Sequence, residues 1–212
     1  MNSLDTIGRK TGTDKSSVHH DYLHVYESYL KQYRNDPISL IELGVGGYQF
    51  ADRGGESARM WYEYLTAAKI ITVDIYPKDN IINDRVEFWQ GSQTDVHLLN
   101  TILDRESNAM QRVVIDDASH NNQLTIASFH LIFPKLQSGD LYFIEDVHTS
   151  YWENEEYEGK RWPGEPVTTM WFFTTLCHQL NAHAFDSKHH NEFTGQIEFI
   201  HFYKELIVIK KL

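Results

Sequence analysis

Strand-like apolar runs alternate with helix-like segments along most of this chain, and that alternation restricts the fold more than any other feature. Five apolar runs are expected to form strands, at residues 38–43, 69–74, 85–90, 111–115 and 141–144. Helical spacing or capping signals lie between them, near residues 57–68, 95–105 and 122–135. Strands that alternate with helices predict a parallel sheet with right-handed crossovers.

The two ends of the chain depart from this alternation. A helix is expected near residues 17–31, capped by Asp14 or Ser16. Near the other end, residues 148–165 form an expected long mobile loop that contains Trp152, Trp162, Pro163 and Gly164. A helix near 167–180 and two strand-like runs, 197–203 and 206–210, follow it.

We therefore expect an α/β fold of the Rossmann-like class. Its sheet is mostly parallel, ends in a C-terminal antiparallel hairpin and has helices on both faces. No break in composition marks a second domain, so residues 1–212 are expected to form one domain with residues 1–35 as an N-terminal helical cap.

Composition narrows the class of protein. The formal net charge of −11 argues against broad nucleic-acid binding, which depends on Lys and Arg neutralising phosphates. Met1–Lys10 is polar, and no apolar run approaches the roughly 20 residues of a membrane helix. The single cysteine, Cys177, excludes an internal disulfide and fits a reducing compartment, so a cytoplasmic location is expected.

Acidic clusters close the fourth and fifth expected strands. Asp116 and Asp117 follow the fourth strand with His120 three residues beyond Asp117, and Glu145 and Asp146 follow the fifth. Neighbouring parallel strands end on the same side of a sheet, so these groups are expected to meet. Two carboxylates about 4 Å apart repel by roughly 4 kcal/mol at an effective dielectric of 20, so a cation is expected among them. Asp116 is expected to be a structural acid that caps the next helix.

A glycine turn and an acid indicate a nucleoside site. Gly44, Gly46 and Gly47 follow the first strand, where glycine lets a ligand approach the backbone closely. Asp74 closes the second strand, where a carboxylate can accept both ribose hydroxyls. Asp74 lies about 30 residues beyond Gly44 rather than the roughly 20 of a dinucleotide fingerprint, and no P-loop occurs.

This spacing favours a nucleoside that lacks a diphosphate, such as S-adenosylmethionine. Glu42, just before the turn, could lie near the sulfonium and amino group of that ligand. Lys15 and Ser17 could reach it from the N-terminal helix.

Ordered sequence blocks give the chain a family resemblance. It resembles the class I methyltransferases and, more narrowly, the metal-dependent sugar O-methyltransferases of macrolide biosynthesis, with their rhamnosyl O-methyltransferase and cephalosporin hydroxylase relatives. The blocks that carry the resemblance are Gly12-Thr13-Asp14-Lys15, Glu42-Leu43-Gly44-Val45-Gly46-Gly47, Gly91-Ser92-Gln93-Thr94-Asp95, Ile115-Asp116-Asp117-Ala118-Ser119-His120 and Ile144-Glu145-Asp146-Val147-His148-Thr149-Ser150-Tyr151-Trp152.

The resemblance implies roles for particular residues. It implies that Asp117, Glu145 and Asp146 hold Mg²⁺, that His120 is the catalytic base and that Asp74 binds the ribose. The segment that holds the adenine matches Ser92, Gln93 and Asp95, and Asp117 also falls among the cofactor-binding residues. The family usually has glycine where Ala118 stands, a change that leaves these groups intact. Some macrolide enzymes carry a further N-terminal domain without a counterpart in these 212 residues, so substrate and assembly are not implied.

The predicted function is Mg²⁺-dependent transfer of a methyl group from S-adenosylmethionine to a hydroxyl of a sugar or glycosylated natural product. The metal would bind a vicinal diol and lower its pKa, and His120 would remove the proton. A non-haem Fe(II) oxygenase using His120, His148 and a carboxylate, and a nucleoside-binding protein without catalysis, remain alternatives. The expected partner is a small diol-bearing molecule, with no nucleic acid and no membrane; relatives are often oligomeric, which leaves a homo-oligomer open.

Overall fold

The computed structural model describes residues 2–81, 83–160 and 167–212, and it divides into two compact units. The first unit comprises Met1–Ser92 with Asn108–Gln111, and the second comprises Gln93–Ser107 with Arg112–Leu212. Each unit has its own strands and helices.

The first unit contains three parallel strands. They are β1 (Ser39–Leu43), β2 (Lys69–Asp74) and β3 (Val86–Gln90), in the order β3-β2-β1. Leu43 pairs with Val73 and Asp74 pairs with Gln90, so these strands end together. All five residues of β1 are buried, as is typical of a parallel strand covered on both faces.

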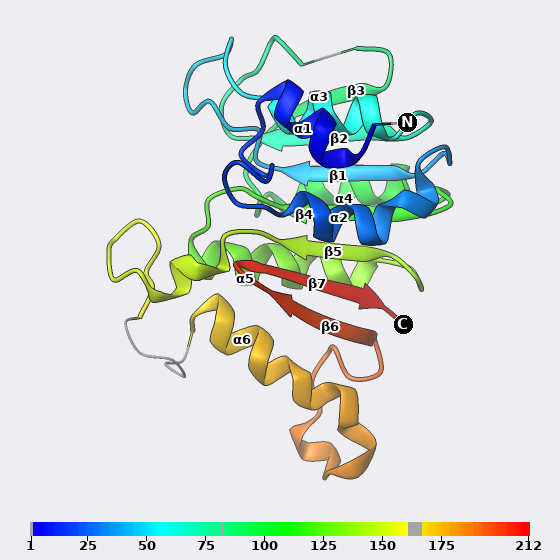
Figure 1. The fold of residues 1–212 in the computed structure, drawn as a ribbon. Coiled ribbons are helices and arrows are strands. Elements are labelled where there is room, and N and C mark those ends of the chain that lie inside the picture. The colour runs from blue at the N-terminus through cyan, green and yellow to red at the C-terminus, as the bar shows by residue number, and fades with distance from the viewer. Residues whose placement is uncertain (1, 82, 161–166) are drawn as a thin grey trace. The chain divides into compact units, whose positions relative to one another are not determined.

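Three α-helices accompany these strands. They are α1 (Leu4–Thr11), α2 (Leu23–Leu30, continued by η1, Lys31–Tyr33) and α3 (Glu56–Tyr64). α1 packs against α3, and the two lie on the same side of the strands (Figure 1). Tyr26 of α2 meets Trp61 of α3 edge-on, with 5.1 Å between the ring centroids. Both residues are fully buried, so this contact belongs to the core of the first unit.

The N-terminal helix prediction is wrong in its start. The helix begins at Leu23 rather than near residue 17, and Tyr22 precedes it without a side-chain cap. Asp5 accepts hydrogen bonds from both the backbone N and the hydroxyl of Ser17, which holds this segment in turns. Neither Asp14 nor Ser16 is a helix cap. Helix α1 was not predicted from the sequence, although Ser3 caps it by accepting from Thr6 N.

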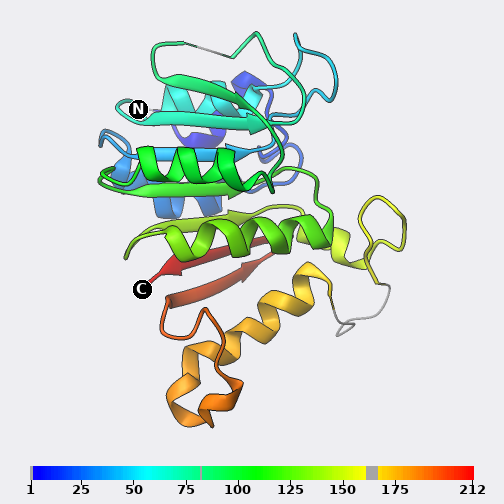
Figure 2. The ribbon, with the colours of Figure 1, turned by 180° about the vertical axis from the view of Figure 1, so that it is seen from behind.

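The second unit contains a four-stranded mixed sheet. Its strands are β4 (Arg112–Asp116), β5 (Leu141–Ile144), β6 (Ile197–Tyr203) and β7 (Leu206–Lys211), in the order β4-β5-β7-β6. β4 and β5 are parallel, whereas β7 is antiparallel to both β5 and β6. The helices α4 (Val96–Arg105) and α5 (Asn122–Ile132, continued by η2, Phe133–Lys135) lie on one face of it (Figure 2).

Four helical elements lie between β5 and the hairpin in the described part of the chain. They are η3 (Val147–Tyr151), α6 (Thr169–Leu176), η4 (Cys177–Ala184) and η5 (Ser187–His189). Phe173 of α6 packs edge-on against Phe129 of α5, with 4.9 Å between ring centroids. The predicted loop at 148–165 therefore begins with a 3₁₀ helix, and its residues Trp162, Pro163 and Gly164 lie outside the described residues.

The structure confirms the predicted fold class. All seven expected strands are present: the first three pair in parallel in the first unit, β4 and β5 pair in parallel in the second, and the last two form an antiparallel hairpin. The predicted helix at 167–180 is α-helical only over Thr169–Leu176. A 3₁₀ helix, Cys177–Ala184, follows it. In the part of the chain that the structure describes, no helix combines the length and apolar character needed to cross a membrane.

Candidate active site

The glycine turn after β1 has the backbone that its sequence predicts. Gly44 and Gly46 have φ values of 94° and 73°, in the left-handed region that favours glycine. A Cβ added to Gly47 would lie 2.4 Å from the carbonyl of Arg53, so the two arms of the loop touch there. A Cβ on Gly46 would meet no described atom within 4 Å. The turn is thus closed on one side and open at Gly46, as a close-approach site requires.

A buried lysine holds the far arm of this loop. Lys78 donates through Nζ to the carbonyl oxygens of Tyr48 at 2.6 Å and Phe50 at 3.2 Å, and its side chain is buried. Lys78 has no signal in the sequence, because nothing local shows that a lysine 30 residues beyond Tyr48 pairs with this loop.

Asp74 lies beside the glycine turn, where a ribose-binding acid is expected. Its Oδ2 accepts from Val45 N at 3.0 Å and its Oδ1 accepts from Tyr76 N at 2.9 Å. Each carboxylate oxygen has two lone pairs, so each can still accept one further hydrogen bond. The side chain is therefore oriented in advance, with capacity left for two hydroxyls.

Glu42 and Lys15 form a buried group beneath the turn. Glu42 accepts from Ser57 Oγ at 2.9 Å and Trp61 Nε1 at 3.3 Å, and Lys15 Nζ lies 3.8 Å from its Oε1. Both charged side chains are almost fully buried. Buried charges persist where they are paired and hydrogen-bonded, so this group anchors residues 13–16 to the end of β1. A contact with the cofactor stays a prediction for both residues.

The predicted adenine segment makes structural contacts at two of its positions. Gln93 donates through Nε2 to Asp116 Oδ1 at 3.3 Å and accepts from Ser119 N at 3.1 Å. Asp95 caps α4 by accepting from the backbone N atoms of His97 and Leu98, both at 3.0 Å. Ser92 is the last residue of the first unit's main segment. Their contact with adenine stays a prediction.

The ends of β4 and β5 bring two carboxylates and one imidazole together. One ligand atom each of Asp117, His120 and Asp146 lies within 4.8 Å of the others. His120 Nε2 is 3.8 Å from Asp117 Oδ1 and 3.5 Å from Asp146 Oδ2. These distances are longer than those of ordinary hydrogen bonds, and they leave the three groups close enough to surround one cation. All three side chains are partly exposed.

Glu145, the third expected metal ligand, is placed differently. It is 4% exposed, its backbone N donates to Asp116 O at 3.0 Å, and its carboxylate is not a member of the group above. Its role as a ligand stays a prediction.

Two residues of the group have an unusual backbone. His120 has φ 54° and Asp146 has φ 53°, in the left-handed region. Such conformations cost roughly 1–3 kcal/mol at non-glycine residues and cluster at functional sites. The hydroxyl of Thr149 lies 2.9 Å from His120 O and 3.0 Å from Asp146 O, so it ties the two strained turns together. Thr149 belongs to a family block, but its role could not be derived from the sequence.

Asp116 is a buried acid that does not cap a helix. Asn121 caps α5 instead, by accepting from Gln123 N at 3.0 Å and Leu124 N at 3.2 Å. Asp116 accepts from Ser128 Oγ, from Tyr142 OH at 3.2 Å and from Gln93. Burial raises the pKa of its carboxyl to about 6, although the hydrogen bonds from Ser128 and Tyr142 act in the opposite direction. The prediction of a structural acid holds, but the helix-capping mechanism is wrong.

The second unit also brings Glu205, which was not predicted to be a site residue, close to Asp146 and His148. Glu205 occupies the turn between β6 and β7, and its carbonyl accepts from Val147 N at 3.2 Å. His148 Nδ1 lies 3.9 Å from both Glu205 Oε2 and Asp146 Oδ1. The hairpin was predicted, but its docking beside Asp146 was not, because it depends on antiparallel pairing with β5.

The donor set fits a hard divalent cation. Mg²⁺ prefers oxygen ligands and commonly keeps positions for water or substrate. The group contains two carboxylates and one imidazole and does not include His148, so it is the reverse of the two-histidine, one-carboxylate set of non-haem iron oxygenases. The composition of the site therefore favours Mg²⁺ over Fe(II).

Comparisons with known proteins point to one class. No family model matches the chain. An 8-demethyl-8-(2-methoxy-α-L-rhamnosyl)-tetracenomycin-C 3′-O-methyltransferase of Streptomyces olivaceus is 35% identical over 148 residues, which are 70% of this chain and 37% of the relative. The mycinamicin VI 2″-O-methyltransferase of Micromonospora griseorubida is 35% identical over 149 residues, with the same coverage. The solved structure of the MycE methyltransferase in complex with Mg, SAH and mycinamycin VI superposes with a TM-score of 0.87 at 29% identity, over 99% of this chain and 54% of that one.

The chain belongs to the class I S-adenosylmethionine-dependent methyltransferases. Within that class its relatives are sugar O-methyltransferases of macrolide and tetracenomycin pathways, and this confirms the resemblance drawn from the sequence. The chain spans about half the length of these relatives or less.

Proposed function

We propose that this chain uses Mg²⁺ and S-adenosylmethionine to methylate a hydroxyl of a sugar on a glycosylated small molecule. The observation that carries this proposal is the group of Asp117, His120 and Asp146 at the ends of two neighbouring parallel strands. Support also comes from the relatives, whose names describe O-methylation of sugars, and from the related structures that contain Mg and SAH.

Asp117 and Asp146, with Glu145 beside them, would hold the metal. When bound, Mg²⁺ supplies Lewis acidity that lowers the pKa of the hydroxyls of a vicinal diol. His120 accepts the proton of the reacting hydroxyl at Nε2, the ring atom that lies nearest the two carboxylates. Thr149 holds the backbone of His120 and Asp146 and so maintains the distance between the base and the metal-binding carboxylates.

The first unit would supply most of the cofactor contacts. Gly44 and Gly46 let the ligand approach the backbone, and Asp74 accepts the ribose hydroxyls with its remaining lone pairs. Glu42 and Lys15 stabilise the turn through their buried contacts with each other and with Ser57. Both residues are expected to lie near the methionine end of the ligand. The remaining proposed cofactor residues are Ser92, Gln93, Asp95 and Asp117.

The proposed partner is a diol-bearing glycoside rather than a nucleic acid. The formal net charge of −11 opposes binding to phosphates, and the relatives are named for glycosylated small molecules. We further infer one cofactor-binding domain with residues 1–35 as its helical cap, a cytoplasmic location consistent with the single cysteine, and a homo-oligomer as an open assembly state.

A calorimetric titration with S-adenosylhomocysteine tests the cofactor half of this proposal. Asp74→Asn replaces an acceptor oxygen with a donor, so we expect binding about tenfold weaker or worse. Asp79→Asn removes the charge of an exposed acid five residues away and is expected to bind as wild type does. Failure of the wild-type protein to bind either S-adenosylmethionine or its demethylated product would overturn the proposal.

A further inference from the structure

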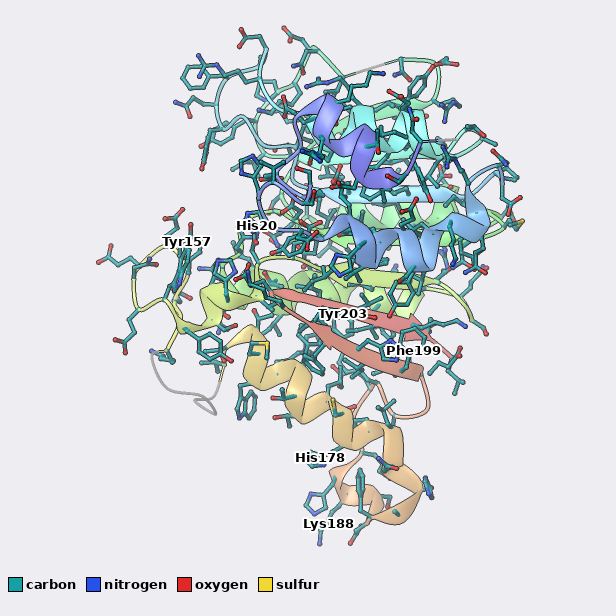
Figure 3. All side chains as sticks on the ribbon, in the orientation of Figure 1. His20, Tyr157, His178, Lys188, Phe199 and Tyr203 are labelled. Carbon is teal, nitrogen blue, oxygen red and sulfur yellow. The ribbon has the colours of Figure 1, made fainter. Side chains whose placement is uncertain are left out.

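Three aromatic rings stand together on the segment that follows Asp146. The indole of Trp152 lies 4.7 Å from the ring of His148 and 5.3 Å from that of Tyr157, at interplanar angles of 74° and 71°. Neither of these two neighbours stacks on the indole, and 45% of Trp152 is exposed. Figure 3 shows Tyr157 on the loop beyond η3. The three rings form an angular wall with part of the indole left uncovered.

Hydrogen bonds fix this wall in place. The carbonyl of Trp152 accepts from Asn154 N at 3.0 Å and from Gly159 N at 3.1 Å, which closes the loop on itself. A Cβ added to Gly159 would lie 2.4 Å from Thr149 O, so only glycine permits this closure. An aromatic surface that is already ordered avoids the entropy cost of ordering its side chains and loop when a ligand binds.

The same loop is anchored at the start of α5, beside the proposed base. Asn122 donates to the carbonyl of Tyr157 from its backbone N at 3.1 Å and from its side chain at 2.7 Å. Asn121 donates to the carbonyl of Glu156 at 2.8 Å. These two asparagines directly follow His120 in the chain. The wall and the proposed base are therefore positioned by one short segment.

The wall is also close to the carboxylates. His148 Nδ1 lies 3.9 Å from Asp146 Oδ1, and the same imidazole ring meets Trp152 edge-on. One ring thus separates the indole from a proposed metal ligand. A hexose offers an apolar C–H surface on one side and hydroxyls around its edge, and an aromatic ring beside a polar group suits both.

We propose that Trp152, flanked by His148 and Tyr157, is the surface on which the apolar side of the acceptor's pyranose ring rests while its hydroxyls reach the Asp117–His120–Asp146 group. This inference rests on the proposed function, because it takes its ligand class from the diol that the metal would hold. It assigns recognition of the sugar ring to an aromatic residue that has no part in the chemical step.

Saturation-transfer NMR with methyl α-L-rhamnopyranoside tests the inference, with Mg²⁺ and S-adenosylhomocysteine present. We expect transfer to the sugar's ring protons in the wild-type protein and in Trp152→Phe. Trp152→Ala should reduce the transfer about fivefold or more, because the stacking surface is lost. Phe202→Ala, which removes a comparably exposed aromatic residue on β6, should leave the transfer unchanged.

Trp152→Leu keeps apolar volume without a ring and decides the matter if the alanine variant does not fold. Wild-type transfer in the folded Ala or Leu variant would overturn the inference, as would the absence of transfer in a wild-type protein that binds Mg²⁺ and S-adenosylhomocysteine. If the proposed function itself is wrong, the result differs, because calorimetry then detects no binding of the metal or of S-adenosylhomocysteine.

Discussion

Thr149 connects the two strained residues of the proposed metal site. Its single hydroxyl lies within hydrogen-bonding distance of the carbonyl oxygens of His120 and Asp146, and both of these residues have positive φ. Some side chains hydrogen-bond to metal-binding residues without touching the metal. Their replacement commonly lowers metal affinity 10–100-fold. Thr149 is therefore the residue whose loss should loosen the site without removing any ligand.

Replacement of Thr149 by valine should weaken Mg²⁺ binding about tenfold, because the methyl group cannot donate to either carbonyl. Thr149→Ser keeps the hydroxyl and should bind Mg²⁺ nearly as wild type does. Metal titration calorimetry measures both variants, and S-adenosylhomocysteine affinity should be unchanged in each. Equal Mg²⁺ affinity in the valine and serine variants would show that the tie has no role in the site.

The residue types of the site could be predicted from the sequence, whereas their exact contacts could not. Asp117, His120 and Asp146 follow apolar strands, and parallel strands end at one edge, so their meeting was predictable. The positive φ values of His120 and Asp146 have no local signature, since neither residue is glycine. Gln93 shows the same limit, because its amide spans from Asp116 to Ser119 only after the strands have assembled.

At the scale of elements, Asp116 joins three parts of the second unit. It is the last residue of β4, and it accepts hydrogen bonds from Ser128 of α5 and Tyr142 of β5. Burial is the largest influence on its carboxyl and raises the pKa from 3.8 to about 6. The ionised form is thus less stable in the folded protein than in the unfolded chain.

This shift predicts how stability depends on pH. Between about pH 4 and pH 6 the folded protein keeps a proton that the unfolded chain has lost, so the contribution of Asp116 to stability falls as the pH rises through that window. The free energy of unfolding of the wild type, relative to Asp116→Asn, should therefore fall by about 2–3 kcal/mol across it and stay level above.

Urea unfolding at a series of pH values, with a chelator present to exclude metal ions, measures this difference. If this difference in the free energy of unfolding rose between about pH 4 and pH 6, the hydrogen bonds from Ser128 and Tyr142 would outweigh burial. That result would contradict burial as the cause of the raised pKa of Asp116.

The elements themselves were largely predictable. β2 matches its expected range, Lys69–Asp74, because a continuous apolar run ends there in an acid. The N-terminal helices were predicted less well, since the apolar spacing of residues 18–29 continues through a segment that Asp5 holds in turns. That contact joins residues twelve positions apart and leaves no periodic signal.

At the scale of the whole molecule, each compact unit carries one requirement of the proposed reaction. The first has the glycine turn and Asp74, and the second has the carboxylates and His120. The class of the fold was predictable from alternating strands and helices alone. The cofactor and the metal were predicted instead from short blocks of polar residues. The similarity to methyltransferase structures that contain Mg and SAH supports both predictions.

Divalent metal binding by this carboxylate group is the central claim, and Mn²⁺ binding followed by electron paramagnetic resonance tests it most directly. We expect one ion per chain, competed by Mg²⁺, with affinity lowered at least about tenfold in Asp117→Asn and in Asp146→Asn. His120→Gln should retain the ion, because histidine is assigned the proton rather than the metal, and Asp104→Asn, at an exposed acid of α4, should match wild type. Undiminished binding in both Asp117→Asn and Asp146→Asn would contradict the account.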